Sequence, residues 1–242
     1  MSNLENYMKQ QAIFCEQNDS ISKNLYSEYG VKRGLRDEKG QGVLTGLTNI
    51  SDIKAFEYHD GVKSPCDGEL SYRGYNIKDL VTGSKGKRFV FEEGAYLLLF
   101  GELPTDTQLM EFQGRLSDCM ELPTNFTRDV IMKAPTSDIM GSMTRSILTL
   151  GSYDKEKESL EIPNVLRQSM QLIAVFPMLA VYAYHAYCHY EKNESMYIHR
   201  PEKDLSIAEN FLRLLRPDTK FTELESKSTG YSIIVTYGTW WW

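Results

Sequence analysis

The chain has 242 residues, of which 41% are hydrophobic and 25% charged, and its formal net charge is −6. This composition is ordinary for a globular protein with one sizeable domain or two small ones. The negative charge argues against a nucleic-acid-binding surface, which requires clustered lysine and arginine. The densest basic stretch, Lys85, Lys87 and Arg88, is short, and we interpret it as a solvated loop.

The four cysteines are Cys15, Cys66, Cys119 and Cys188, and they show no CxxC spacing. Disulfide frameworks occur in shorter, cysteine-dense secreted chains, so we expect reduced thiols and a cytoplasmic location. Residues 1–10 lack the apolar core of a signal peptide. The most apolar stretch, residues 172–184, is shorter than the roughly 20 residues of a membrane span and is expected to be a buried helix.

The first part of the chain is predicted to contain one helical segment and one small β element. Residues 1–33 are polar and are expected to form the helical segment. Between residues 47 and 75, short runs of β-forming residues are separated by Asp60-Gly61 and Asp67-Gly68. Asp-Gly pairs between such runs are turn signals, so we predict a β-hairpin or meander. A strand pair of this size must pack against helices to be stable.

After the β segment, the sequence pattern predicts one helix after another. Glu92 and Glu93 stand at a helix start, where negative charge complements the helix dipole, and Gly101 ends that helix. Thr105 and Gln108 have the spacing of a capping box at the start of the next helix.

Leu109, Phe112 and Leu116 recur at i, i+3 and i+7, which is typical of the core-facing side of a helix. Further helical patterns cover residues 128–132, 142–150, 162–189 and 206–215. Pro177 is expected to kink or split the third of these, and Asp204 or Ser206 to cap the fourth. The predicted fold class is therefore mainly α, with a small β-hairpin element near the N-terminus.

Several segments, in this order, resemble the citrate synthase family. They are Gly34–Arg36 with Thr45–Ser51, Gly68–Leu80 with its motif YRGY, Phe91–Thr105, and more weakly 146–154 and 205–212. The resemblance covers residues 30–227 and implies that 34–227 are an incomplete, citrate-synthase-like large helical domain. It also implies a homodimer and the substrates acetyl-CoA and oxaloacetate, with no bound cofactor.

The chemistry implied by the resemblance is the condensation of acetyl-CoA with oxaloacetate, followed by hydrolysis of the citryl thioester. Removing the methyl proton needs a carboxylate base, and the enolate needs a hydrogen-bond donor. In the family an aspartate and two histidines have these roles, in segments such as D/E-H-x-x-x-N and G-P-x-H-G-G-A-N that this sequence lacks. We therefore assign no catalytic residue and expect the chain alone to be inactive. A 2-methylcitrate synthase, which uses propionyl-CoA, is the close alternative.

A pair of histidines and the segment at residues 205–210 could each indicate a binding site. His185 and His189 are one helical turn apart, as metal ligands can be, but Cys188 is off their face and there is no HExxH pattern. We interpret them as ordinary helix residues and predict no metal site. The resemblance places residues 205–210 beside the oxaloacetate pocket, where some relatives carry histidine or an aromatic residue and this chain has Ile207. Substrate-binding residues thus stay unassigned.

The C-terminal residues 228–242 do not resemble the family, and they end in three tryptophans. Tryptophan has a single codon, so reading one base later turns these codons into glycine codons. That frame permits L-D-I-x-x-x-x-H-M-E-H-G-G-G, which is similar to the family's catalytic-histidine segment. We therefore expect 228–242 to be an aberrant tail, caused by a frameshift near Lys227 and without a packing partner. The alternative is a non-catalytic helical interaction protein that docks through this apolar tail, with an edge strand over Tyr231–Tyr237.

Overall fold

The computed structural model describes residues 23–30, 34–36, 42 and 48–239. The chain divides into two units, residues 1–48 and residues 49–242. In the first unit, helix α2 runs over Lys23–Glu28, and Arg36 pairs with Gly42 in an isolated β-bridge. Of the helical segment predicted over residues 1–33, only residues 23–30 are described, and they include α2; residues 1–22 and 31–33 lie outside the described part of the chain.

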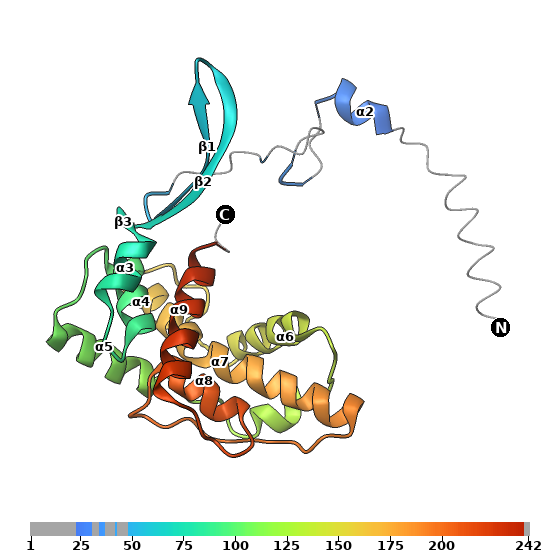
Figure 1. Cartoon of the computed structure of the whole chain (residues 1–242). Coiled ribbons are helices and arrows are strands. Elements are labelled where there is room, and N and C mark those ends of the chain that lie inside the picture. The colour runs from blue at the N-terminus through green and yellow to red at the C-terminus, as the bar shows by residue number, and fades with distance from the viewer. Residues whose placement is uncertain (1–22, 31–33, 37–41, 43–47, 240–242) are drawn as a thin grey trace. The chain divides into compact units, whose positions relative to one another are not determined.

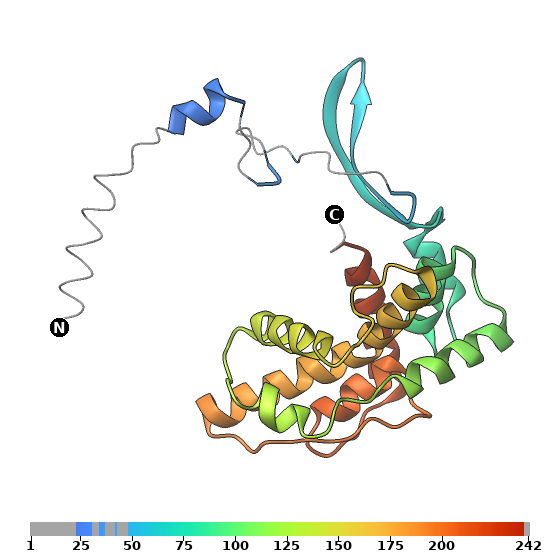
Figure 2. The same ribbon diagram turned by 180° about the vertical axis from the view of Figure 1, so that it is seen from behind.

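The second unit is mainly helical with one small antiparallel sheet, as the sequence predicts (Figure 1). The sheet contains β1 (Ser51–His59), β2 (Val62–Tyr72) and β3 (Tyr75–Asn76), in that order. The helices are α3 (Ile77–Gly83), α4 (Val90–Phe100), α5 (Asp106–Asp118), the π-helix η1 (Thr127–Ile131), α6 (Ile139–Gly151), α7 (Ile162–Lys192), α8 (Ile207–Leu215) and α9 (Glu223–Thr239). Seen from behind, α7 runs through the helical body with α6 and α8 beside it (Figure 2).

The β1–β2 hairpin has one of its two predicted turns. Asp60 and Gly61 both adopt positive φ, 50° and 81°, which matches the twist of the flanking strands. The turn predicted at Asp67-Gly68 is wrong, because both residues lie inside β2. The register of β1 against β2 shifts between Lys54 and Phe56, opposite this pair. A glycine within a strand often marks such an irregularity, so the Asp-Gly pair accommodates a bulge rather than a reversal of the chain.

The main core is formed by buried residues of α4, α5, η1, α7 and α8. The predicted stripe of Leu109, Phe112 and Leu116 is buried. By length and composition, α7 is apolar enough to cross a membrane. Ten of its residues, between Ala174 and Cys188, are buried inside the protein. Pro177 lies inside α7, which continues through it, so of the two predicted outcomes, a kink or a split, the split is wrong.

The C-terminal segment forms helix α9, so the strand considered for residues 231–237 is wrong. Ile234 is 4% exposed and packs in a second core cluster with Tyr72, Leu80 and Leu97. The Tyr72 hydroxyl donates a hydrogen bond of 2.8 Å to the Ile234 carbonyl. The described part of the tail therefore has packing partners, contrary to the expectation that it has none.

Gly94 allows α9 to lie close to α4, while Gly230 faces both α8 and α4. A Cβ added at Gly94 of α4 would overlap the side chain of Ile234. A Cβ added at Gly230 of α9 would meet Ala208 and Val90 at 3.7 and 3.8 Å, which are ordinary contact distances. The helix that contains the supposed tail is thus fitted against α4 and α8.

Candidate functional site

Residues 205–210, which the resemblance connects with oxaloacetate, form the start of α8. Ser206 is the N-cap, not Asp204. The Ser206 hydroxyl accepts a hydrogen bond from the Glu209 amide at 3.1 Å, and Glu209 Oε2 accepts one from the Ser206 amide at 2.8 Å. This capping box satisfies two backbone donors that a helix start otherwise leaves free. Its S-x-x-E spacing is visible in the sequence.

Glu92 reaches from α4 to the same helix start. Its Oε1 accepts a hydrogen bond of 2.7 Å from the amide of Ile207, the first residue of α8. The residue is 1% exposed, and Oε2 is buried without a hydrogen-bond partner among the described residues. Glu92 stands in the first turn of α4, as predicted, but it is buried because this turn of α4 faces the core.

Burial decides the charge state of Glu92. Removing the carboxylate from water raises its pKa from 4.5 to about 7, although the Ile207 amide favours the charged form. The nearby Glu209 carboxylate raises the pKa further, while Arg88 lowers it. Near neutral pH, Glu92 thus changes between a neutral acid and a buried anion.

Arg88 belongs to this network, although it lies in an exposed loop between α3 and α4, as predicted for this basic stretch, and its side chain is 50% exposed. Its Nε lies 2.8 Å from Glu209 Oε1, and its Nη2 lies 2.7 Å from Glu209 Oε2. Nη2 also donates to the Asp204 carbonyl at 2.9 Å. The hydrogen bonds to Glu209 raise the pKa of Arg88. This bidentate ion pair joins residues 121 positions apart in the sequence and fixes the segment before α4 against α8.

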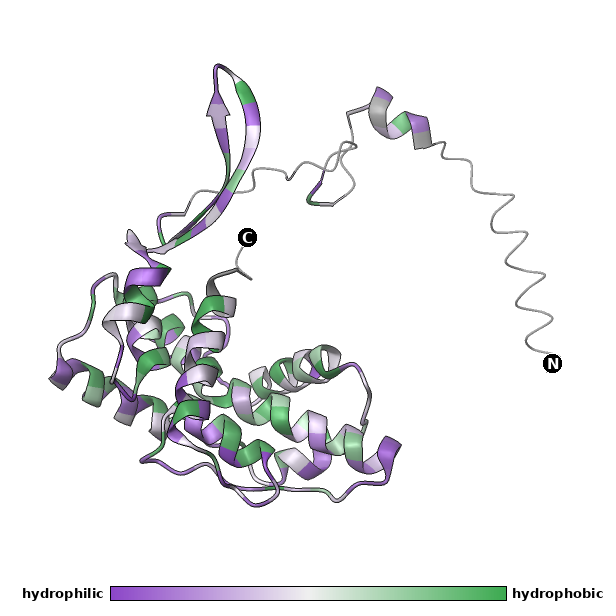
Figure 3. Ribbon diagram, in the orientation of Figure 1, coloured by the Kyte–Doolittle hydropathy of each residue, from purple (hydrophilic) through white to green (hydrophobic). Residues whose placement is uncertain are grey.

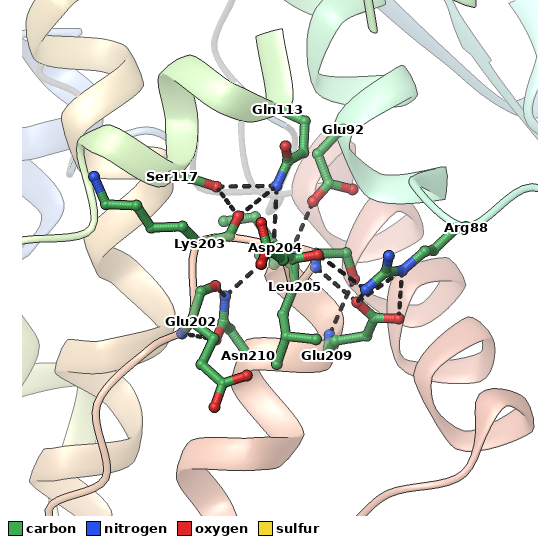
Figure 4. A network of polar contacts seen from close by, with 12 residues as sticks. Arg88, Glu92, Gln113, Ser117, Glu202, Lys203, Asp204, Leu205, Glu209 and Asn210 are labelled. Atoms are coloured by element: carbon green, nitrogen blue, oxygen red, sulfur yellow. Dashed lines mark hydrogen bonds and ion pairs between the residues drawn. The ribbon is translucent and has the colours of Figure 1, made fainter. Parts of the chain in front are cut away.

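The loop before α8 is held from α5 as well as from α8 (Figure 4). Gln113 and Ser117 both donate to the Lys203 carbonyl, at 3.0 and 2.8 Å. Asn210 exchanges two hydrogen bonds of 2.9 Å with the backbone of Glu202. Side chains from α4, α5 and α8 thereby fix residues 202–207. No short sequence motif predicts that these side chains meet.

The network positions the start of α8. A cavity of about 260 Å³ adjoins it, lined by Gly86, Arg88, Glu209, Glu223, Ser226 and Lys227. Its charged groups are already paired, Arg88 with Glu209 and Lys227 with Glu223 at 2.6 Å. The Arg88–Glu209 pair holds the start of α8 in place, whereas the Lys227–Glu223 pair lies within α9.

The histidines singled out in the sequence bind separate backbone carbonyls. His185 is buried, with Nε2 3.1 Å from the Leu214 carbonyl oxygen, and His189 Nδ1 lies 2.7 Å from the Glu194 carbonyl oxygen. Within the described ranges, no group of three His, Cys, Asp or Glu side chains could hold a metal ion. Ile207 is buried in the main core rather than lining a pocket.

One apolar surface lies on α6 and around the start of α7. Figure 3 shows that α6 is mainly hydrophobic, in contrast to the mainly hydrophilic α5. The exposed large side chains of this surface are Met140, Leu148, Leu160, Ile162 and Val165. Exposed apolar side chains that gather on a globular protein usually mark a contact with other parts of a protein or with a partner.

The described residues form a helical scaffold in which a network of polar side chains positions the start of α8. The family model for the citrate synthase C-terminal domain matches residues 35–235. The chain belongs to the citrate synthase family. This match extends past Lys227, where the resemblance seen in the sequence ended, and includes most of α9.

Curated relatives include both citrate synthases and a 2-methylcitrate synthase. The citrate synthase of Saccharolobus solfataricus is 29% identical over 75% of this chain and 41% of that protein. That of Corynebacterium glutamicum is 30% identical over 61% of this chain and 32% of that protein. A 2-methylcitrate synthase of Shewanella oneidensis is 32% identical over 60% of this chain and 36% of that protein. The chain therefore spans less than half the length of these relatives.

Solved citrate synthases have a similar fold. The enzyme of Pyrobaculum aerophilum aligns with a TM-score of 0.64 and 24% identity, over 85% of this chain and 49% of that chain. The enzyme of Thermoplasma acidophilum, solved as a ternary complex with carboxymethyl coenzyme A and oxaloacetate, has a TM-score of 0.65 and 21% identity, over 80% and 45%. The predicted fold class, mainly α and citrate-synthase-like, is confirmed.

Proposed function

We propose that this chain is the N-terminal half of a citrate synthase and does not catalyse the condensation by itself. The observation that supports a fragment is the match of the citrate synthase C-terminal domain model over residues 35–235 in a chain that covers about half of the solved enzymes. The assignment to the N-terminal half rests on the resemblance, whose segments in this sequence precede the family's catalytic segments. The aspartate and histidines that the resemblance assigns to catalysis belong to segments that this sequence lacks.

The test of this proposal is the release of CoA thiol from acetyl-CoA and oxaloacetate by the purified chain. No turnover above background is expected, and a complete citrate synthase assayed in parallel is the control. Turnover above about 1 per second, typical of an ordinary enzyme, would place the active site within this chain and refute the proposal.

In the complete enzyme, the described network would support the substrate site rather than react. The resemblance places residues 205–210 beside oxaloacetate, and Glu92, Arg88 and the Ser206–Glu209 capping box hold this helix start. Such support keeps groups that touch the substrate in a fixed geometry. We therefore assign to these residues a positioning role in the proposed reaction.

The frameshift near Lys227 remains part of the proposal. The alternative reading frame supplies H-M-E-H-G-G-G where the present frame ends in three tryptophans, and this supports a shift. The packing of Ile234 and the family match to residue 235 instead support the present frame for α9. DNA sequenced across codon 227 and beyond codon 242 separates the two. A downstream segment like G-P-x-H-G-G-A-N supports the frameshift, and its absence in every frame would refute it.

The alternative of an interaction protein that docks through its tail has less support. Ile234, the central apolar residue of that tail, already packs inside this chain. The apolar surface on α6 and α7 is the better contact region, and we propose that it is covered in the complete protein, which the resemblance implies is a homodimer. Sedimentation of the complete, frame-restored protein tests this: a dimer is expected, and a monomer at all concentrations would contradict it.

A second candidate activity is that of 2-methylcitrate synthase, because the Shewanella oneidensis relative is 32% identical to this chain. The two activities differ in the acyl-CoA used. A frame-restored enzyme assayed with acetyl-CoA and with propionyl-CoA distinguishes them through the ratio of the two kcat/KM values. A ratio that favours propionyl-CoA would select the second candidate.

A further inference from the structure

Glu92 is a buried carboxyl group in which only one of the two oxygens has a hydrogen-bond partner among the described residues. Its Oε1 binds the Ile207 amide at 2.7 Å, while Oε2 is buried and has no hydrogen-bond partner in the described structure. A protonated carboxyl group tolerates such a place, because it carries no net charge to desolvate. An ionised carboxylate does not, unless a cation compensates it.

The charged groups around Glu92 do not supply that compensation. Arg88, just before α4, is committed to Glu209 through two hydrogen bonds of 2.8 and 2.7 Å. Glu209 of α8 brings a second negative charge. On the side of α5, the network residues Gln113 and Ser117 are neutral.

The more distant charges of the network are also paired with each other. Lys203, in the loop before α8, pairs with Asp118 of α5 at 2.9 Å, and both side chains are exposed. On α9, Lys227 pairs with Glu223, and the residue that approaches α4 is the apolar Ile234. Each cation named around Glu92 therefore has another carboxylate as its partner.

We propose that Glu92 is a proton-dependent anchor for α8: its protonated carboxyl group holds the helix start against α4, and loss of the proton releases it. The released state lets water reach the carboxylate, which the closed packing prevents. Because α8 carries Glu209 and Asn210, release would also loosen the contacts to Arg88 and to the loop at residue 202. This proton-dependent contact affects the folding stability of the chain and the local opening of α8, so the proposal does not depend on the proposed catalytic function.

The sign of the pH dependence follows from the direction of the shift. The pKa of Glu92 is raised in the folded chain, from 4.5 to about 7. The stability that the protonated form contributes is complete below the ordinary pKa and is lost as the pH rises through about 7. Between about pH 5 and about pH 8, this group alone lowers the folding equilibrium constant by roughly 70-fold.

The test measures urea unfolding of the full chain at both pH values, for the unmodified chain, Glu92→Gln and Glu111→Gln. Glutamine keeps the shape and the acceptor for Ile207 but cannot ionise. Glu111 lies on α5 with its side chain 69% exposed, so its variant is the control. We expect Glu92→Gln to lose most of the roughly 70-fold fall and Glu111→Gln to retain it. Equal pH dependence in all three proteins would overturn the proposal.

A measurement on the unmodified chain covers the case in which Glu92→Gln does not fold. NMR titration of the Glu92 carboxyl group is followed together with hydrogen exchange of the Ile207 amide. Titration near neutral pH with a parallel fall in the protection of Ile207 supports the anchor. Titration at the ordinary value for glutamate, or constant protection of Ile207 while Glu92 ionises, overturns it.

Discussion

Replacing Ile234 with alanine tests whether α9 is a genuine part of the fold. Ile234 is 4% exposed and contacts the cluster of Tyr72, Leu80 and Leu97. The substitution removes most of the side chain that fills the space beside Gly94. It leaves the backbone carbonyl that accepts the Tyr72 hydrogen bond, so the expected effect is one of packing alone.

The expected loss is about 2–5 kcal/mol of unfolding free energy, the usual range for truncating a buried isoleucine to alanine. Small domains have a total of only about 5–15 kcal/mol, so this loss is a large share. Helix propensity acts in the opposite direction, because alanine is the best helix former. A measured destabilisation therefore cannot come from a weakened isolated helix and must come from lost contacts with α4 and the sheet.

The assay is urea unfolding followed by circular dichroism, with Leu224→Ala as the matched control. Leu224 lies on the same helix but is 78% exposed, so its variant should change stability by no more than about 0.5 kcal/mol. If Ile234→Ala is no more destabilising than Leu224→Ala, α9 is not docked. Residues 228–239 would then be a tail without a packing partner, as the frameshift reading first suggested.

Three further predictions concern the same helices and the surface. Gly94→Ala should destabilise the chain by about 1–3 kcal/mol in the same assay because its Cβ overlaps Ile234, whereas Gly114→Ala on α5, where nothing lies within 4 Å, should not. Glu209→Ala should cost about 1–3 kcal/mol because the Ser206 amide and Arg88 lose their partner; an unchanged unfolding midpoint would contradict this. Hydrogen bonds from Gln168 and Arg167 lower the pKa of Asp154 to about 2, so its contribution to stability is present above 3.8 and is lost as the pH falls through about 2; NMR titration near 3.8 would refute this.

Local signals in the sequence were sufficient to predict most helix ends and the β1–β2 hairpin. The capping box of Thr105 and Gln108 is present in the structure, and Gly101 ends α4 with φ of 86°. The turn at Asp60-Gly61 is also where it was predicted. These features depend on residues within four positions of one another, so their physical causes are contained in short stretches of sequence.

Local propensity failed where packing overrides it. Ile233, Ile234 and Val235 are β-branched and favour a strand in isolation, but they lie in α9. The contacts of Ile234 with α4 and the sheet outweigh that preference. Asp67-Gly68 failed for a related reason, because pairing with β1 absorbs the irregularity as a bulge within β2.

The sequence by itself determined the fold class, the family and most helix boundaries. Only the tertiary structure decided that Glu92 accepts a hydrogen bond from the first amide of α8 and that Arg88 binds Glu209. The partners in these contacts are 115 and 121 positions apart, so no local pattern records them. The charge state of Glu92 depends on burial by these distant segments, because water is excluded only after the helices have packed together.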